Sequence, residues 1–166
     1  MRRIIVIGCP GSGKTTFAKK LQGVTGLPLY HLDAIWHRAD KTHIEREEFD
    51  GILSGLLAKN EWIIDGNYGR TLEMRLKECD TVFLFDLPAE VSLQGALERL
   101  GKRRVDLPWI EEELAPEFRQ RILSFADEAL PQIYGLLENY KSTRKIIIFK
   151  SRKEAEDFFG NFRAEK

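Results

Sequence analysis

Residues 3–16, RIIVIGCPGSGKTT, decide the fold of this 166-residue chain. Residues 4–7 are a run of β-branched residues, which is typical of a strand that is buried on both faces. The letters that follow match the pattern G-x-x-x-x-G-K-[ST], with its fixed positions at Gly8, Gly13, Lys14 and Thr15. The stretch therefore predicts a buried strand, a phosphate-binding loop and a helix that begins at the loop.

The residue types of this loop suit a nucleoside triphosphate. Glycines let successive backbone N–H groups converge on phosphate oxygens, and the start of the next helix adds its positive dipole end. Lys14 would place a positive charge near the β- and γ-phosphates, and the Thr15 hydroxyl would complete a Mg²⁺ shell. A dinucleotide-binding loop is disfavoured, because it would need a third small residue where Thr16 stands.

Length and composition favour one compact domain without a global charge. Lys plus Arg and Asp plus Glu both number 26, so a direct nucleic-acid-binding role is not expected. Two cysteines are too few for a disulfide framework or a Cys-rich zinc site. No segment is long enough to be a signal peptide or to span a membrane, so we expect a cytoplasmic protein without a membrane partner. Oligomeric state is not predicted.

Buried runs alternate with helical periodicity along the rest of the chain. Strands are expected at residues 29–32, 62–64, 81–85 and 145–149. Helices are expected at residues 17–24, 44–59, 71–77, 89–100, 116–140 and 154–162, with Pro131 kinking or dividing the long one. Residues 34–42 show no periodicity and are expected to form a loop. This order argues for a parallel sheet that is covered on both faces.

Two aspartates follow strands of this sheet, where ligands of open parallel sheets bind. Asp65 follows the third strand and could hold a water ligand of Mg²⁺. Asp33 follows the second strand and is a site candidate, with a turn or helix cap as its alternative. For Arg70, at the start of the next helix, a phosphate contact and a solvated position are both open.

A basic segment, GKRRVDLP at residues 101–108, is predicted to be mobile because glycine and proline flank its charges. Arg103 and Arg104 in such a loop could close over a bound triphosphate and spread the charge of the transition state. The alternative is a solvated surface run.

Together these motifs resemble the nucleoside monophosphate kinases among the P-loop proteins. Asp65-Gly66 followed by Arg70-Thr71 is similar to the adenylate kinase pattern D-G-F-P-R-T, with one extra residue here. Residues 85–88 (FDLP) and 101–104 (GKRR) resemble the end of that family's fourth strand and the start of its lid. A closer likeness is to the topology modulation protein (FlaR-like) family of adenylate kinase relatives, through residues 31–34 (HLDA), 62–68 (WIIDGNY) and Arg103-x-x-Asp106.

This resemblance implies a three-layer α/β/α P-loop NTPase fold with a five-stranded parallel sheet of order 2-3-1-4-5. It implies one kinase-like domain over residues 1–166, with an acceptor-binding helical region at about 34–60 and a short basic lid at about 101–118. The cysteines of the adenylate kinase zinc lid are missing. The resemblance carries phosphate binding onto Gly8, Cys9, Pro10, Gly11, Ser12, Gly13, Lys14, Thr15 and Thr16.

The leading hypothesis is a phosphotransferase that uses ATP and Mg²⁺ and acts on a nucleotide or another small acceptor. The candidate metal ligands are Thr15 and Asp65. The candidate catalytic residues are Lys14, Asp33, Arg70, Arg103 and Arg104. Asp33 would orient the hydroxyl of an alcohol acceptor, whereas Arg70 would grip the phosphate of a monophosphate acceptor. The rival hypothesis is a nucleotide-binding regulator or weak NTPase with an indirect effect on DNA topology.

Overall fold

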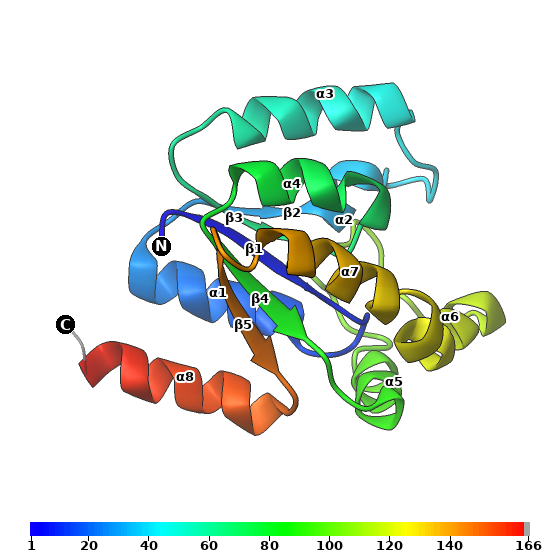
Figure 1. Ribbon diagram of the computed structural model, residues 1–166. Coiled ribbons are helices and arrows are strands. Elements are labelled where there is room, and N and C mark those ends of the chain that lie inside the picture. The colour runs from blue at the N-terminus through cyan, green and yellow to red at the C-terminus, as the bar shows by residue number, and fades with distance from the viewer. Residues whose placement is uncertain (165–166) are drawn as a thin grey trace.

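The computed structural model describes residues 1–164, with side chains through residue 162, and contains a five-stranded parallel sheet between two layers of helices (Figure 1). The strand order β2-β3-β1-β4-β5 confirms the predicted fold class. The strands are β1 (Arg3–Gly8), β2 (Leu29–His31), β3 (Trp62–Asp65), β4 (Thr81–Phe85) and β5 (Lys145–Phe149).

The predicted helices are present with shifted ends, and the structure adds two short helical elements that the sequence did not predict, at residues 32–36 and 69–71. They are α1 (Lys14–Thr25), α2 (Leu32–Trp36), α3 (Arg46–Leu57), the short 3₁₀ helix η1 (Gly69–Thr71), α4 (Leu72–Glu78), α5 (Ala89–Glu98), α6 (Pro116–Glu128), α7 (Leu130–Tyr140) and α8 (Arg152–Ala164). The predicted effect of Pro131 is confirmed, because the long periodic stretch divides into α6 and α7 just before this residue. A proline ring cannot donate the backbone hydrogen bond that would continue α6.

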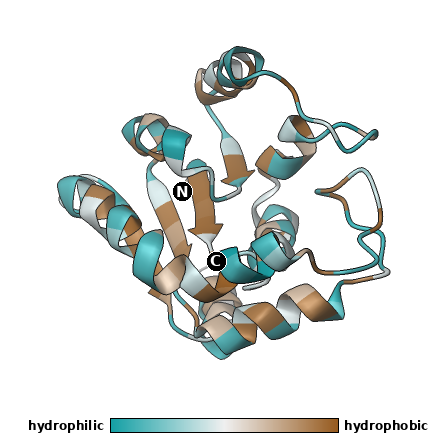
Figure 2. Ribbon diagram, turned by 90° about the vertical axis from the view of Figure 1, so that its right-hand side faces the viewer, coloured by the Kyte–Doolittle hydropathy of each residue, from teal (hydrophilic) through white to brown (hydrophobic). Residues whose placement is uncertain are grey.

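The β-branched residues of β1 form the centre of the core. Ile5 and Ile7 are buried in the cluster that packs under α3, α4, α6 and α7. Ile4 and Val6 are buried in the cluster on the opposite face, under α1 and α8. Figure 2 shows the strands of the sheet mostly in brown, between helices of mixed teal and brown. Each such side chain contributes about 1.5–3 kcal/mol when it is fully buried, so β1 anchors both layers.

The expectation of a loop at residues 34–42 is partly wrong. The chain enters α2 directly after β2, which ends at His31 and not at residue 32. Residues 37–43 then form a narrow turn closed by an antiparallel bridge between His37 and His43. The Trp36 and His43 rings stack at 4.4 Å with 8° between their planes. A five-residue helix is too short for its periodicity to be visible in sequence.

The register of the sheet brings several polar groups to one edge. Val6 and His31 are both register partners of Asp65, and Gly8 is the partner of Phe85. The strands are parallel, so the loop after β1 and the ends of β2 and β3 meet at the same edge. This edge holds the candidate site.

A buried arginine stabilises the turn that follows β3. Arg75 on α4 is fully buried, and its guanidinium donates hydrogen bonds to the carbonyl oxygens of Gly66 (2.8 Å), Tyr68 (2.8 Å) and Thr71 (3.4 Å). Burial lowers its pKa to about 10, so the side chain stays charged at neutral pH. The backbone of the turn therefore has its carbonyl groups satisfied by one side chain.

We expect Arg75→Met to lower the free energy of unfolding by about 3 kcal/mol, because it leaves buried carbonyl groups without donors. Urea denaturation followed by circular dichroism measures this change. Lys77→Met, at an exposed position of the same helix, is the matched control and should change stability by less than about 0.5 kcal/mol. Equal stability of the two variants would contradict the role given to Arg75.

Candidate functional site

The loop between β1 and α1 is shaped to present backbone N–H groups. Gly13 adopts a φ of 103°, a left-handed conformation that glycine accepts readily, and α1 begins at the next residue. The first N–H groups of a helix have no partner within the helix. Those of Lys14, Thr15 and Thr16 therefore point out of the start of α1, as an anion requires.

The loop also lies unusually close to α5. A Cβ atom on Gly11 would be 2.0 Å from the carbonyl oxygen of Ser92, and one on Gly95 would be 2.1 Å from the carbonyl oxygen of Gly11. Only glycine allows this approach. Arg152 of α8 donates a hydrogen bond of 3.1 Å to the same Gly11 oxygen. The contact positions α5, and with it Arg99, beside the loop.

Lys14 lies at the centre of the site. Its Nζ donates to the carbonyl oxygen of Cys9 at 3.1 Å, within the loop itself. Burial lowers the pKa of Lys14, and the negative charges of Asp65 and Asp33 oppose this shift. Among the described residues, the ammonium group is thus held beside the loop by one neutral acceptor, which a phosphate oxygen could replace.

Asp65 joins the start of α1 to the end of β2. Its Oδ2 accepts hydrogen bonds from the Thr15 hydroxyl (2.8 Å) and lies 2.9 Å from Nδ1 of His31. The side chain is 4% exposed, and its Oδ1 has no hydrogen-bond partner among the described residues. An orphaned carboxylate oxygen beside a threonine hydroxyl at the start of a helix fits the oxygen ligands that Mg²⁺ prefers.

Asp33 and Tyr68 form a second pair. The Tyr68 hydroxyl donates to Oδ1 of Asp33 at 2.7 Å. Burial, together with the Asp33 charge, raises the pKa of Tyr68, so the phenol keeps its proton. Because β2 ends at His31, Asp33 is the second residue after the strand and not the first, as the sequence suggested, and it lies in α2. The bond from Tyr68 holds its carboxylate in one orientation.

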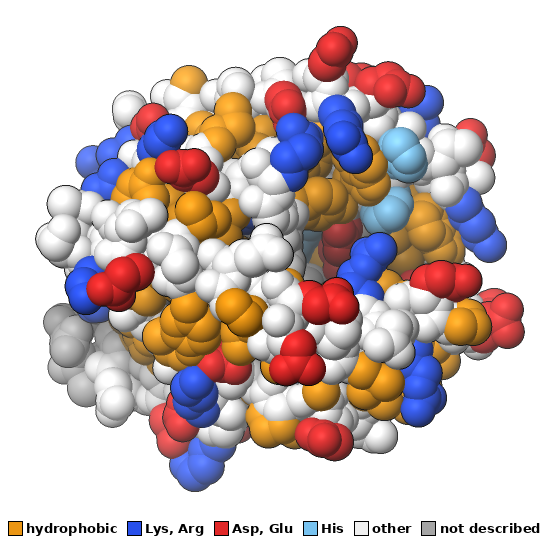
Figure 3. Space-filling model, turned by 45° about the vertical axis from the view of Figure 1, so that its right-hand side comes forward, with side chains coloured by type: hydrophobic (Ala, Val, Ile, Leu, Met, Phe, Trp, Pro, Cys, Tyr) orange, Lys and Arg blue, Asp and Glu red, His pale blue; other side chains and the backbone are white. Residues whose placement is uncertain are grey.

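Two cavities open beside these groups. The first, of about 560 Å³, is lined by residues 11–16 of the loop and by parts of α5, α8 and the basic segment. The second, of about 540 Å³, is lined by Asp33, Asp65, Pro10 and residues of α2, α6 and the basic segment. Figure 3 shows a hollow with acidic side chains in its depth and histidines on its rim. Both cavities are lined by Lys14, Thr15, Arg99, Arg104 and Asp106.

The structure separates the nine predicted loop residues into three groups, one of which is Pro10 alone, on the wall of the second cavity. Gly11, Ser12, Gly13, Lys14, Thr15 and Thr16 line the first cavity. Gly8 is packed against Phe85, and Cys9 is buried with its thiol 3.8 Å from the Ile122 carbonyl oxygen. These two residues line neither cavity and shape the loop from behind.

The basic segment is held in place by acidic residues within it and just after it. Arg104 donates to both oxygens of Asp106 (3.0 and 2.6 Å) and to Glu111 (2.7 Å). Burial opposes the charge of Arg104, but these bonds outweigh it and raise the pKa of the guanidinium. Arg103 is exposed and lines only the first cavity.

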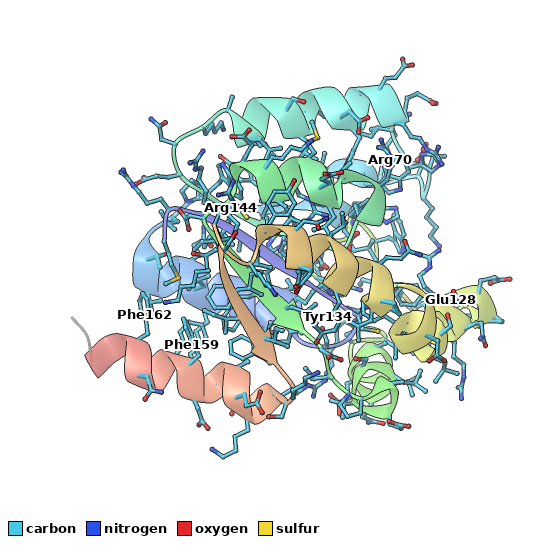
Figure 4. All side chains as sticks on the ribbon, viewed as in Figure 1. Arg70, Glu128, Tyr134, Arg144, Phe159 and Phe162 are labelled. Atoms are coloured by element: carbon cyan, nitrogen blue, oxygen red, sulfur yellow. The ribbon has the colours of Figure 1, made fainter. Side chains whose placement is uncertain are left out.

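Arg70 lies outside both cavities. Its guanidinium pairs with the two carboxylate oxygens of Asp50 on α3, at 2.7 and 2.9 Å (Figure 4). From the predicted acceptor region at residues 34–60, only Trp36 and His37 line the second cavity. The opposite wall comes from α6, through Phe118, Arg121, Ser124, Phe125 and Glu128.

Sequence reasoning missed Arg99. This residue follows α5 and lines both cavities, and its Nε is buried without a hydrogen-bond partner in the described part of the chain. Burial lowers its pKa, and the neighbouring charge of Arg104 acts in the same direction. The sequence feature that could have indicated Arg99 was Gly95. A glycine inside a predicted helix is a sign of close backbone approach, and Arg99 stands one turn further along that helix.

Comparisons with known proteins find similarity to kinases. No family model matches the chain. Adenylate kinase of Thermotoga petrophila is 30% identical over 88 residues, which cover 52% of this chain and 39% of that protein. Adenylate kinase of Sorangium cellulosum is 29% identical over 145 residues, which cover 82% of this chain and 66% of that protein. The chain thus matches only part of the length of these relatives.

A solved structure covers the whole chain. Shikimate kinase from Acinetobacter baumannii, in complex with shikimate, aligns with 100% of this chain and 95% of its own, with a TM-score of 0.62 and 18% identity. The fold is that of a P-loop kinase.

Among the described residues, no helix is both long enough and apolar enough to cross a membrane.

We expect Asp65→Asn to weaken the Mg²⁺-dependent part of triphosphate binding by about tenfold or more, because the amide lacks the charge that attracts the ion. Calorimetry with ATP, in Mg²⁺ and in EDTA, measures this part. Asp86→Asn is the control, since Asp86 also follows a strand but bonds Tyr134 and Lys150 outside both cavities. An equal loss of affinity in Mg²⁺ and in EDTA would show that Asp65 does not act through the ion.

Proposed function

We propose that the protein is a phosphotransferase that moves a phosphoryl group from ATP to a small acceptor with the help of Mg²⁺. One observation carries the proposal: two cavities of similar size meet at Lys14, Thr15, Arg99, Arg104 and Asp106. A protein that only binds or hydrolyses a triphosphate needs one such cavity. Two cavities that share a cationic boundary suit the transfer of a group between two substrates.

In this proposal the first cavity holds the donor. The N–H groups at the start of α1 and the Lys14 ammonium bind its phosphates. Thr15 and Asp65 would hold Mg²⁺, which neutralises phosphate charge when it is bound. Arg99 and Arg103 lie on the opposite wall, with Arg104 between the cavities. These arginines would stabilise the charge on the transferred phosphoryl group.

The acceptor then occupies the second cavity, with Asp33 as the group that orients it. The similarity to adenylate kinases supports a phosphotransferase, and the motifs at residues 31–34 and 62–68 support placement in the topology modulation protein (FlaR-like) branch. The basic segment would act as a lid over the donor. Arg70 would serve a monophosphate acceptor only if it left Asp50.

Transfer of label from [γ-³²P]ATP to a panel of nucleosides, nucleoside monophosphates and small alcohols tests this function. We expect one class of acceptor to become labelled, and Lys14→Met to abolish the transfer because the phosphates lose their nearest cation. Lys145→Met, at the exposed start of β5, is the control and should transfer normally. ATP turnover that no acceptor stimulates would instead favour a regulator or weak NTPase.

Arg99 gives a sharper test of where the phosphoryl group passes. We expect Arg99→Ala to lower kcat on the order of 100-fold while the protein stays folded, because a preorganised cation is lost from the boundary between the cavities. The matched control is Arg119→Ala on α6, outside both cavities. Steady-state kinetics compares the variants. Equal kcat values for the two would remove Arg99 from the mechanism.

A further inference from the structure

The second cavity offers few free cations to an acceptor. Its described lining carries the carboxylates Asp33, Asp65, Asp106, Glu111 and Glu128 and the cations Lys14, Arg99, Arg104 and Arg121. Lys14 and Arg99 also face the first cavity, where the donor phosphates would engage them. Arg104 already pairs with two carboxylates, at 2.6 and 2.7 Å. The remaining cation is Arg121, an exposed residue of α6.

A phosphate group would therefore be poorly accommodated beside Asp33. A phosphate dianion close to a carboxylate is repelled unless cations compensate both charges. Arg70 cannot supply this compensation from its present position, because Asp50 holds both sides of its guanidinium and it does not line the cavity. The charge pattern favours an acceptor without a phosphate.

The carboxylate of Asp33 has one oxygen that could accept a hydrogen bond from a hydroxyl group. The Tyr68 phenol occupies Oδ1, and no described side chain is found to donate to Oδ2. Arg75 donates to the Tyr68 carbonyl oxygen at 2.8 Å, which fixes the backbone from which the phenol extends. A carboxylate oriented by one donor, with its second oxygen available, can accept the hydrogen of an alcohol.

The walls of the cavity are aromatic. Trp36, His37, Tyr68, Trp109 and Phe118 all line it and are partly exposed. The His37 ring, from the turn after α2, and the Trp109 ring, directly after the basic segment, meet edge to face at 5.2 Å. Aromatic walls with a few polar groups bind flat or cyclic molecules well, since ring faces stack on one another.

We propose that the acceptor is a ring-bearing alcohol without a phosphate group, such as a nucleoside, and that Asp33 receives its hydroxyl proton. This inference rests on the proposed function. The hydroxyl oxygen forms a bond to the γ-phosphorus, and the bond from that phosphorus to the β–γ bridging oxygen breaks. ADP leaves with the electron pair, and the proton passes to Oδ2 of Asp33. The products are a phosphate monoester and ADP.

The test compares matched pairs of acceptors that differ by one phosphate. The five common nucleosides form one arm and the corresponding nucleoside monophosphates form the other. Myo-inositol and pyridoxine are added to the first arm as further alcohols without a phosphorylated counterpart. Both arms are incubated with [γ-³²P]ATP and Mg²⁺. Quenching of tryptophan fluorescence, in the presence of a non-hydrolysable ATP analogue, reports binding near Trp36 and Trp109 independently of turnover. We expect label and quenching in the first arm, at least about tenfold stronger than in the second.

Variants identify the residue responsible. Asp33→Asn should lower kcat about 100-fold while the affinity for the ATP analogue stays unchanged, because the amide cannot take the proton. Asp40→Asn, at an exposed position of the neighbouring turn, is the matched control. Arg70→Ala should leave transfer within about twofold of the parent, as expected of an exposed ion pair.

Two results would overturn this assignment. One is preferential labelling of the monophosphates, which would leave the proposed phosphotransferase function in place. Loss of this labelling in Arg70→Ala would then assign the acceptor phosphate to Arg70. The other is binding of the ATP analogue while no acceptor of the first arm, which lacks phosphate, is bound or labelled. Failure to bind ATP or its analogue at all would instead contradict the proposed function itself.

Discussion

The hydrogen bond from the Thr15 hydroxyl to Asp65 joins the first turn of α1 to the end of β3, and the rest of the site depends on it. It exists because β1 and β3 pair in parallel with Val6 opposite Asp65. A buried carboxylate is costly unless it has partners, and Asp65 obtains them from Thr15 and from its own register neighbour, His31. Oδ1 of Asp65 has no hydrogen-bond partner among the described residues, and a cation bound there would compensate its charge.

A second constraint comes from the close approach of two glycines. Gly11 and Gly95 let the loop and α5 touch through their backbones, so that α5 ends with Arg99 over the boundary between the cavities. Any side chain at either position would push α5 away. The same contact explains why a glycine stands inside a helix, where it otherwise costs up to about 1 kcal/mol relative to alanine.

The two cavities differ in charge. The first combines the start of α1 with lysines and arginines on facing walls, which suits a polyanion. In the second, carboxylates outnumber the uncommitted cations, and aromatic rings make up much of the wall. Arg104 and Asp106 neutralise each other at the boundary, so this ion pair adds no net positive charge to either cavity. This asymmetry supports the proposed distinction between a phosphorylated donor and an acceptor without phosphate.

Local patterns in the sequence were enough to predict the loop of residues 8–16, the buried strands, the division at Pro131 and the carboxylates near the strand ends. These features depend on backbone preferences and on periodicity, which neighbouring residues specify. Only tertiary structure decided the place of Arg70 beside Asp50 and the pairing of Arg104 with Asp106 and Glu111. It also decided the position of Arg99, whose Nε has no hydrogen-bond partner among the described residues. A long arginine side chain reaches several partners at once, and which carboxylate it meets depends on how helices pack and not on the residues beside it in the chain.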